Sequence, residues 1–128
     1  MRLLLDTHAL LWALLDPSKL GKRARKLIES TDNTRVVSAA SAWEIATKFR
    51  LGKLPEAENI VRDYPVHLAT MMATELAITS QHALAASLWR VEHRDPFDRI
   101  LAAQSVIEGI ALVTCDTAFN DFPITAIW

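Results

Sequence analysis

Short apolar runs recur along the chain between longer segments of mixed character. Their length and their aliphatic content are typical of buried strands rather than of helices. Four such runs cover residues 2–5 (RLLL), 35–38 (RVVS), 75–78 (ELAI) and 111–114 (ALVT), and residues 124–127 (ITAI) are a candidate fifth. The pattern therefore predicts four to five short strands.

The segments between these runs have helical periodicity or residues that commonly end helices. Within residues 21–30, Ala24, Leu27 and Ile28 fall on one helical face. Glycine after a periodic segment is a common helix end, as at Gly52 and Gly109. Helices are predicted over residues 9–15, 21–30, 41–51, 56–64, 80–89 and 96–108.

Short apolar strands that alternate with helices indicate an α/β fold with a mainly parallel sheet. In such sheets ligands bind beyond the carboxyl ends of the strands. Asp6 directly follows the strand predicted over residues 2–5, and Asp116 follows the one over residues 111–114. Both acids are therefore expected at the ligand-binding edge.

The apolar start of the chain, LLLDTHALLWALL over residues 3–15, also resembles the core of a secretory signal peptide. Asp6 and His8 interrupt it, however, and no small-residue cleavage site follows. The run is also shorter than the about 20 apolar residues that a transmembrane helix needs. We therefore expect a protein that is neither exported nor membrane-bound.

Composition narrows the class of protein further. The chain has 128 residues, which is enough for one domain with a hydrophobic core. Its single cysteine, Cys115, excludes an intrachain disulfide and fits a cytoplasmic location. The formal net charge of −1 gives no overall basic field, although the chain would be net basic without four acids that stand apart.

These four acids stand at predicted transitions from strand or loop to helix: Asp6, Glu44, Asp98 and Asp116. Each has a purely structural explanation. Ser41 and Glu44 have the spacing of a capping box, and Asp95 can cap a helix whose first turn holds Asp98. Asp6 and Asp116 can each cap the helix that follows a strand.

Together, however, the four acids would gather at one edge of a parallel sheet. Carboxylates packed side by side repel one another and raise one another's pKa values. A hard divalent cation such as Mg²⁺ or Mn²⁺ relieves that repulsion, and nearby helix N-termini favour a phosphate. The arrangement suits metal-assisted cleavage of phosphodiester bonds.

Four stretches resemble the PIN-domain family, and in particular the VapC toxins of bacterial toxin–antitoxin pairs. They are LLLDTHALLW, SAASAWEIATKFRLGKL, HRDPFDRILAAQS and LVTCDTAF, in the order and spacing of that family. The resemblance implies a single PIN domain over residues 1–128, with a PIN-like three-layer α/β/α sandwich. It also implies a Mg²⁺- or Mn²⁺-dependent ribonuclease that acts as a toxin, forms a homodimer and is blocked by a cognate antitoxin protein.

By the same resemblance, the metal ligands would be Asp6, Asp98 and Asp116. Glu44 would complete the catalytic site, either as a ligand or through a water molecule. The family also places a threonine or serine near the last acid, where this chain has Thr114. Asp121 is a possible additional acid.

Basic residues provide candidate contacts to RNA phosphates. Lys22 and Arg23 lie in a basic run that is either a solvated helix face or a phosphate-binding patch. Arg99, next to Asp98, is a second candidate, unless it pairs with a neighbouring acid. The four histidines lack zinc-binding spacing and are interpreted as structural or surface residues, with His8 a possible exception because of its position beside Asp6.

Three other functions fit parts of the same pattern. An aspartate-dependent phosphatase needs an acid two residues after the first one, where this chain has His8. A signalling receiver domain needs an acidic pair near the first strand and a lysine at the end of the last, and both are missing. A PIN-fold module that binds RNA or protein without cutting remains open, although all four acids are present.

Overall fold

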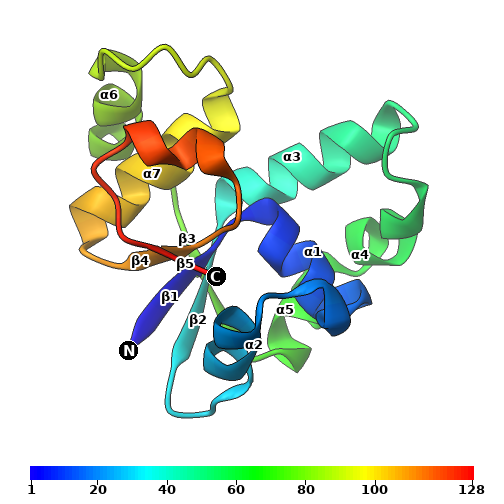
Figure 1. The fold of residues 1–128 in the computed structure, drawn as a ribbon. Coiled ribbons are helices and arrows are strands. Elements are labelled where there is room, and N and C mark those ends of the chain that lie inside the picture. Colours follow the sequence, from blue (N-terminus) through cyan, green and yellow to red (C-terminus); the bar gives the residue numbers. More distant parts are fainter.

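A computed structural model describes residues 1–128, and its centre is one five-stranded sheet (Figure 1). The strands follow the order β3-β2-β1-β4-β5, and every neighbouring pair is parallel. Their bounds are β1 Arg2–Leu5, β2 Thr34–Ser38, β3 Ala73–Leu76, β4 Ala111–Val113 and β5 Ala126–Ile127. The predicted parallel α/β sheet is confirmed.

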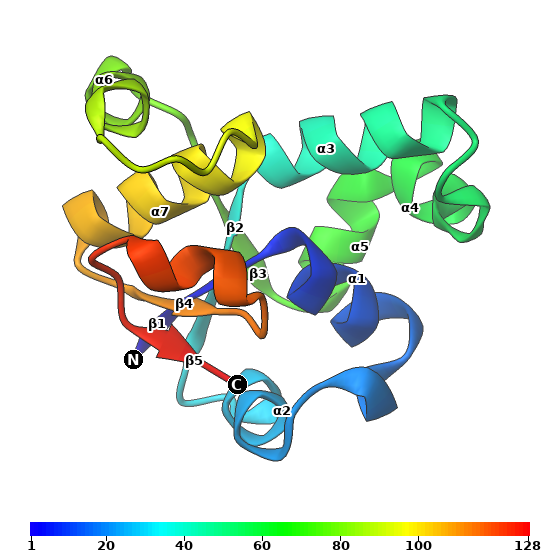
Figure 2. The same cartoon turned by 45° about the horizontal axis from the view of Figure 1, so that its top comes forward.

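Helices connect successive strands (Figures 1 and 2). They are α1 Thr7–Leu15, α2 Lys22–Glu29, α3 Ala39–Arg50, α4 Glu58–Arg62, α5 Tyr64–Thr70, α6 Ser80–Leu88 and α7 Pro96–Glu108. Three short 3₁₀ helices are η1 Pro17–Lys19, η2 Pro55–Ala57 and η3 Thr117–Asp121. None of the helices combines the length and apolar character needed to cross a membrane.

The alternation of side chains along β1 divides the core into two layers. Leu3 and Leu5 pack in a cluster with residues of α1, α2, α4 and α5. Leu4, between them, packs on the other face with residues of α7 and η3. Because all three leucines are fully buried, helices cover both faces of the sheet. This is the predicted three-layer α/β/α sandwich.

The strand register sets up the candidate site. Leu5 at the end of β1 pairs with Val37 on one side and with Val113 on the other. The carboxyl ends of these three central strands are therefore level. The residues that follow them emerge at the same edge of the sheet, as Asp6 and Thr114 do.

The start of α3 differs from the sequence prediction. The helix begins at Ala39, and Ser38 is its N-cap, accepting a hydrogen bond from the Ala40 N–H at 3.0 Å. Ser41 is buried inside the helix and does not cap it, so the predicted capping box with Glu44 is not formed. The helix starts before the predicted residue 41 because β2 ends at Ser38, and Ser38 can cap a helix that begins directly after the strand.

The segment between α3 and β3 also differs from prediction. The helix predicted over residues 56–64 is divided into η2, α4 and α5. Pro65 lies in the first turn of α5, where its missing N–H does no harm, but it would interrupt a helix that continued from α4. The strand predicted over residues 75–78 is β3, shifted towards the N-terminus.

Candidate active site

Asp6 joins the end of β1 to the start of α1. Its Oδ1 accepts a hydrogen bond from the Ala9 N–H at 2.7 Å, so Asp6 is the N-cap of α1. The side chain is almost completely buried, and this burial raises its pKa above the ordinary value. The hydroxyl of Thr114 and the Ala9 N–H oppose that rise because both stabilise the ionised form.

Thr114 and Asp116 occupy the turn that follows β4. The Thr114 hydroxyl oxygen accepts a hydrogen bond from the Asp116 N–H at 3.0 Å. Asp116 Oδ1 in turn accepts one from the Ala118 N–H at 2.9 Å and caps η3. The negative charge of Asp116 contributes to the raised pKa of Asp6, so the two carboxylates repel each other.

Asp98 lies in the first turn of α7, which Asp95 caps as predicted. The pKa of Asp98 is raised to about 6, mainly by burial and also by the negative charges of Asp95 and Glu44. A hydrogen bond to His93 acts in the opposite direction. The ring Nε2 of His93 is 2.8 Å from Asp98 Oδ2, whereas Asp98 Oδ1 has no hydrogen-bond partner in the protein.

Glu44 projects from the second turn of α3 and is 4% exposed. Its Oε1 accepts a hydrogen bond from the Thr7 hydroxyl at 2.5 Å, and its Oε2 accepts one from Lys48 Nζ at 2.6 Å. The Thr7 hydroxyl also lies 3.1 Å from Ser41 Oγ. Glu44 is thus linked to the first turn of α1 and to the next turn of its own helix.

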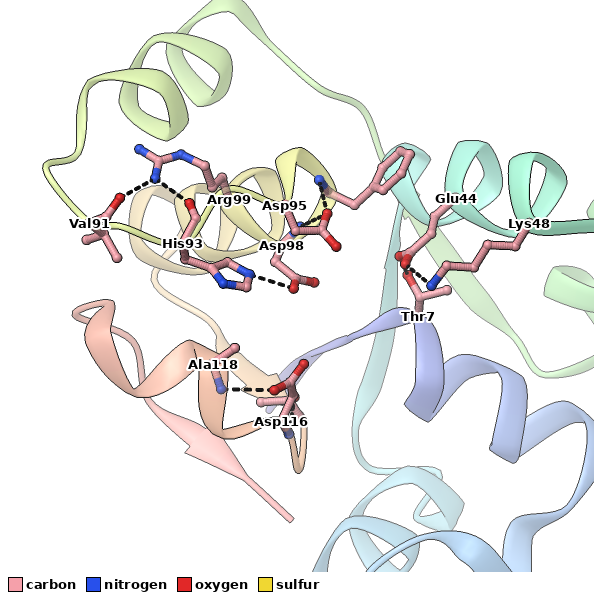
Figure 3. Close-up of polar contacts among 12 residues, drawn as sticks. Thr7, Glu44, Lys48, Val91, His93, Asp95, Asp98, Arg99, Asp116 and Ala118 are labelled. Atoms are coloured by element: carbon pink, nitrogen blue, oxygen red, sulfur yellow. Dashed lines mark hydrogen bonds and ion pairs between the residues drawn. The ribbon is translucent and has the colours of Figure 1, made fainter. Parts of the chain in front are cut away.

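The four acids come from four segments at the carboxyl edge of the sheet, and Figure 3 shows Glu44, Asp98 and Asp116 projecting around this edge. Electrostatic coupling links Asp6 with Asp116 and Asp98 with Glu44. No three acidic, histidine or cysteine side chains converge into a complete ligand set. Glu44 and Asp98 instead each contact a basic side chain.

The chemistry of this edge nevertheless fits a hard divalent cation. Its acids provide carboxylate oxygens, the ligands that Mg²⁺ and Mn²⁺ prefer. The capping roles considered for Asp6 and Asp116 are real, yet capping engages one oxygen of each carboxylate. A bound cation lowers the free-energy cost both of their mutual repulsion and of burying their charges. Capping and metal binding are therefore compatible at this site.

Arg99 does not have the phosphate-binding role considered for it. Its guanidinium donates hydrogen bonds to five backbone carbonyl oxygens, those of Ala86, Ser87, Trp89, Val91 and His93, at 2.6–3.4 Å. These bonds account for all five N–H donors of an arginine. Arg99 instead closes the end of α6 and holds the loop that carries His93, so no donor remains for RNA.

The other candidates lie outside this hydrogen-bonded cluster. Lys22 and Arg23 are exposed on α2 and make no ion pair with the four acids. Asp121 is exposed at the end of η3. The ring of His8 lies 5.5 Å from that of Trp12, and its charge lowers the pKa of Asp6.

Sequence reasoning missed Thr7, Lys48 and His93 as contacts of the acids. Lys48 could have been found, because it lies four residues after Glu44 and this spacing places two side chains on one helix face. No local pattern signals the other two. Thr7 lies 37 positions from Glu44, and His93 belongs to a loop without periodicity.

A family model of the PIN domain matches residues 3–124. Ribonuclease VapC22 of Mycobacterium tuberculosis is 34% identical over 118 residues, which cover 88% of this chain and 85% of that protein. Ribonuclease VapC16 of the same organism is 36% identical over 58 residues, which cover 45% of this chain and 41% of that protein.

Two solved structures share the fold. The crystal structure of VapBC2 from Rickettsia felis, bound to a DNA fragment from its promoter, aligns with a TM-score of 0.71 and 14% identity. That alignment covers 99% of this chain and 98% of the other. FitAcB from Neisseria gonorrhoeae aligns with a TM-score of 0.66 and 18% identity over 98% of this chain and 96% of its own.

Proposed function

The chain belongs to the PIN-domain family, and from this premise we propose that it is a metal-dependent endoribonuclease. The reaction would be the hydrolysis of phosphodiester bonds in RNA. The observation that supports this proposal most directly is that four acids emerge from segments at one edge of the sheet, where Asp6 is electrostatically coupled to Asp116, and Asp98 to Glu44. The relative named Ribonuclease VapC22, which aligns over most of the chain, supports the same substrate class.

Within this proposal, Asp6, Asp98 and Asp116 hold a Mg²⁺ or Mn²⁺ ion. A bound ion of this kind lowers the pKa of a coordinated water molecule and neutralises charge on the phosphate. The role proposed for Glu44 is to accept a hydrogen bond from the attacking water molecule and to orient it. The N-termini of α1 and α7, which carry Asp6 and Asp98, favour a phosphate at the same edge.

Thr114 contacts two of these acids. Its hydroxyl interacts with the Asp6 carboxylate and accepts the Asp116 N–H, so one buried side chain orients both acids. Lys22 and Arg23 remain proposed contacts for more distant phosphates of the RNA. Their exposure on one helix leaves their charges available to a polyanion.

The physiological role that we propose is that of the toxin in a toxin–antitoxin pair. The fold is shared with VapBC2 and FitAcB, and VapC22 is a sequence relative. A cognate antitoxin protein, a homodimeric toxin and a cytoplasmic location complete this proposal. Co-expression with the neighbouring reading frame, followed by size-exclusion chromatography with light scattering, would test the antitoxin complex and the dimer together.

Cleavage of RNA by the purified protein tests the proposed activity. Total cellular RNA is incubated with Mg²⁺, with Mn²⁺ or with a chelator, in parallel with the variant Asp98→Asn. The matched control is Asp32→Asn, because Asp32 is an exposed acid just before β2, at the opposite end of the strand from the candidate site. We expect discrete fragments that require metal, that Asp98→Asn does not produce and that the control does. Intact RNA under all conditions, from folded protein free of partners, would instead favour a PIN-fold binding module.

A further inference from the structure

Glu44 differs from the other acids of the site in how its oxygens are used. Both are already bonded within the protein, Oε1 by the Thr7 hydroxyl and Oε2 by the Lys48 ammonium group (Figure 3). The Asp98 and Asp116 carboxylates each keep one oxygen without a protein hydrogen bond. Asp98 and Asp116 therefore each have a carboxylate oxygen to offer to a cation without breaking an existing contact, whereas Glu44 does not.

The charge of Glu44 is compensated within its own helix. The Glu44 side chain is 5% exposed, and an ionised group that is so deeply buried needs a partner of opposite charge. Lys48 provides that partner from one turn further along α3, with its own side chain 38% exposed. The ammonium group thus links the buried carboxylate to solvent, and the Glu44–Lys48 pair has no net charge.

Thr7 fixes the pair to the rest of the site. It directly follows Asp6, and its hydroxyl contacts both Glu44 and Ser41 across two helices. Because these contacts are buried, rotation of Glu44 towards a cation would leave Thr7 and Lys48 without their acceptor. The packing of α1 against α3 therefore favours the orientation of Glu44 that the structure shows.

We propose that the Glu44–Lys48 pair stays closed when a divalent cation binds, and that Lys48 is a positioning residue that keeps Glu44 out of the ligand set. This inference rests on the proposed function. The cation is then held by Asp6, Asp98 and Asp116, and Glu44 acts only on water or substrate. Lys48 adds a positive charge at the rim of the site, where it compensates Glu44 and leaves the other three carboxylates to the cation.

The affinity for Mn²⁺, measured by isothermal titration calorimetry without RNA, tests this arrangement with a double-variant cycle. The variants are Glu44→Gln, Lys48→Gln and the combination of both. We expect Glu44→Gln to weaken binding about tenfold, because Lys48 then repels the cation without compensation. Lys48→Gln should strengthen binding by a similar factor. The affinity of the double variant for Mn²⁺ should lie within about threefold of that of the unaltered protein, because two uncharged glutamines replace an ion pair that has no net charge.

Two control variants test whether the effect depends on the position and on the charge of Lys48. Lys53→Gln removes an exposed lysine beyond the end of α3 and should change the affinity less than twofold. Lys48→Arg keeps the charge and should bind Mn²⁺ like the unaltered protein. Thermal unfolding followed by circular dichroism verifies that each variant is folded at the temperature of the titration.

A double variant that binds Mn²⁺ as weakly as Glu44→Gln alone would overturn the inference, because Glu44 would then be a ligand. The failure of the proposed function has another signature: the unaltered protein would bind no Mn²⁺ at all.

A second measurement, by NMR on the unaltered protein, does not depend on the folding of any variant. The ¹⁵N-ammonium resonance of Lys48, assigned with Lys48→Arg, should stay at its ion-paired position during titration with Mg²⁺. A shift to the position of free lysine would contradict the closed pair.

Discussion

The ring Nε2 of His93 lies 2.8 Å from Oδ2 of Asp98, so the loop before α7 folds back onto the first turn of the helix. The next residue, Arg99, donates to the backbone carbonyl of the same histidine at 2.8 Å. Two consecutive residues of α7 therefore bind the side chain and the backbone of one loop residue. The acid that belongs to the candidate site and the arginine that supports the loop are parts of one local structure.

The partly buried Asp98 carboxylate should lower the stability of the metal-free protein at neutral pH. Burial raises its pKa to about 6 from the ordinary value of 3.8, so the folded state binds this proton more tightly than the unfolded state does. The contribution of Asp98 to folding therefore becomes less favourable as the pH rises from about 4 to about 6. We expect Asp98→Asn to stabilise the fold by about 2 kcal/mol at pH 7.5.

Urea denaturation of the metal-free protein at pH 7.5 and at pH 4 measures this effect. The gain should nearly vanish at pH 4, where Asp98 is largely protonated. Asp121→Asn is the control, and we expect a change below about 0.5 kcal/mol at either pH. A destabilised Asp98→Asn protein at pH 7.5 would show that the ionised carboxylate is favourable in the fold.

Substitution of Arg99 should affect the fold more than any direct contact with RNA. In Arg99→Lys one ammonium group replaces a fork that reaches five carbonyl oxygens, so several carbonyls lose their donors. We expect a loss of about 3 kcal/mol in the free energy of unfolding. Arg94→Lys changes an exposed arginine of the same loop and should be nearly neutral. Equal stability of the two variants, measured by urea denaturation, would contradict the structural role of Arg99.

The contact between Gly21 and Trp128 should make Gly21 sensitive to a single methyl group. A Cβ atom at position 21 would lie 2.6 Å from Cδ1 of the Trp128 ring and 2.8 Å from its backbone carbon. The indole, which also packs on Trp12, would have to move. We expect Gly21→Ala to cost about 2 kcal/mol.

The partner variant Trp128→Ala distinguishes this clash from a backbone effect. If the ring causes the loss, Gly21→Ala should cost much less in the Trp128→Ala background, so the two substitutions should not be additive. Chemical denaturation of the two single variants and the double variant measures this coupling. Additive losses would place the origin of the effect outside the indole ring, in the backbone at Gly21 or in its contact with the backbone of residue 128.

A divalent cation should stabilise the protein, because only the folded chain brings the acids to one edge. At a Mn²⁺ concentration 100 times the dissociation constant, the expected gain is about 2.7 kcal/mol, seen as a rise in melting temperature that EDTA reverses. Asp6→Asn should abolish most of the rise, since the amide retains the capping oxygen but lacks the charge. A similar rise in the Asp6→Asn variant would exclude Asp6 as a ligand, and the exposed Asp32, changed to Asn, is the control.

Local sequence signals were reliable wherever the structure depends on nearby residues. The helix from Pro96 to Glu108 begins after the Asp95 cap and ends at Gly109 in the left-handed conformation, as its sequence predicts. The same logic was misleading where two caps compete. Ser38 and Ser41 are both suitable N-caps, and the position at which β2 ends makes Ser38 the cap.

By itself, the sequence determined the parallel α/β sheet, the family and the placement of Asp6 and Asp116 after strands, because these depend on spacing and on local backbone preference. Only the tertiary structure decided which partner each acid has. The bond from Thr7 to Glu44 depends on how α1 packs against α3, and the loss of Arg99 as a phosphate contact depends on the path of the loop between α6 and α7. Local patterns extend over about one helical turn, whereas these contacts join segments that only the folded core brings together.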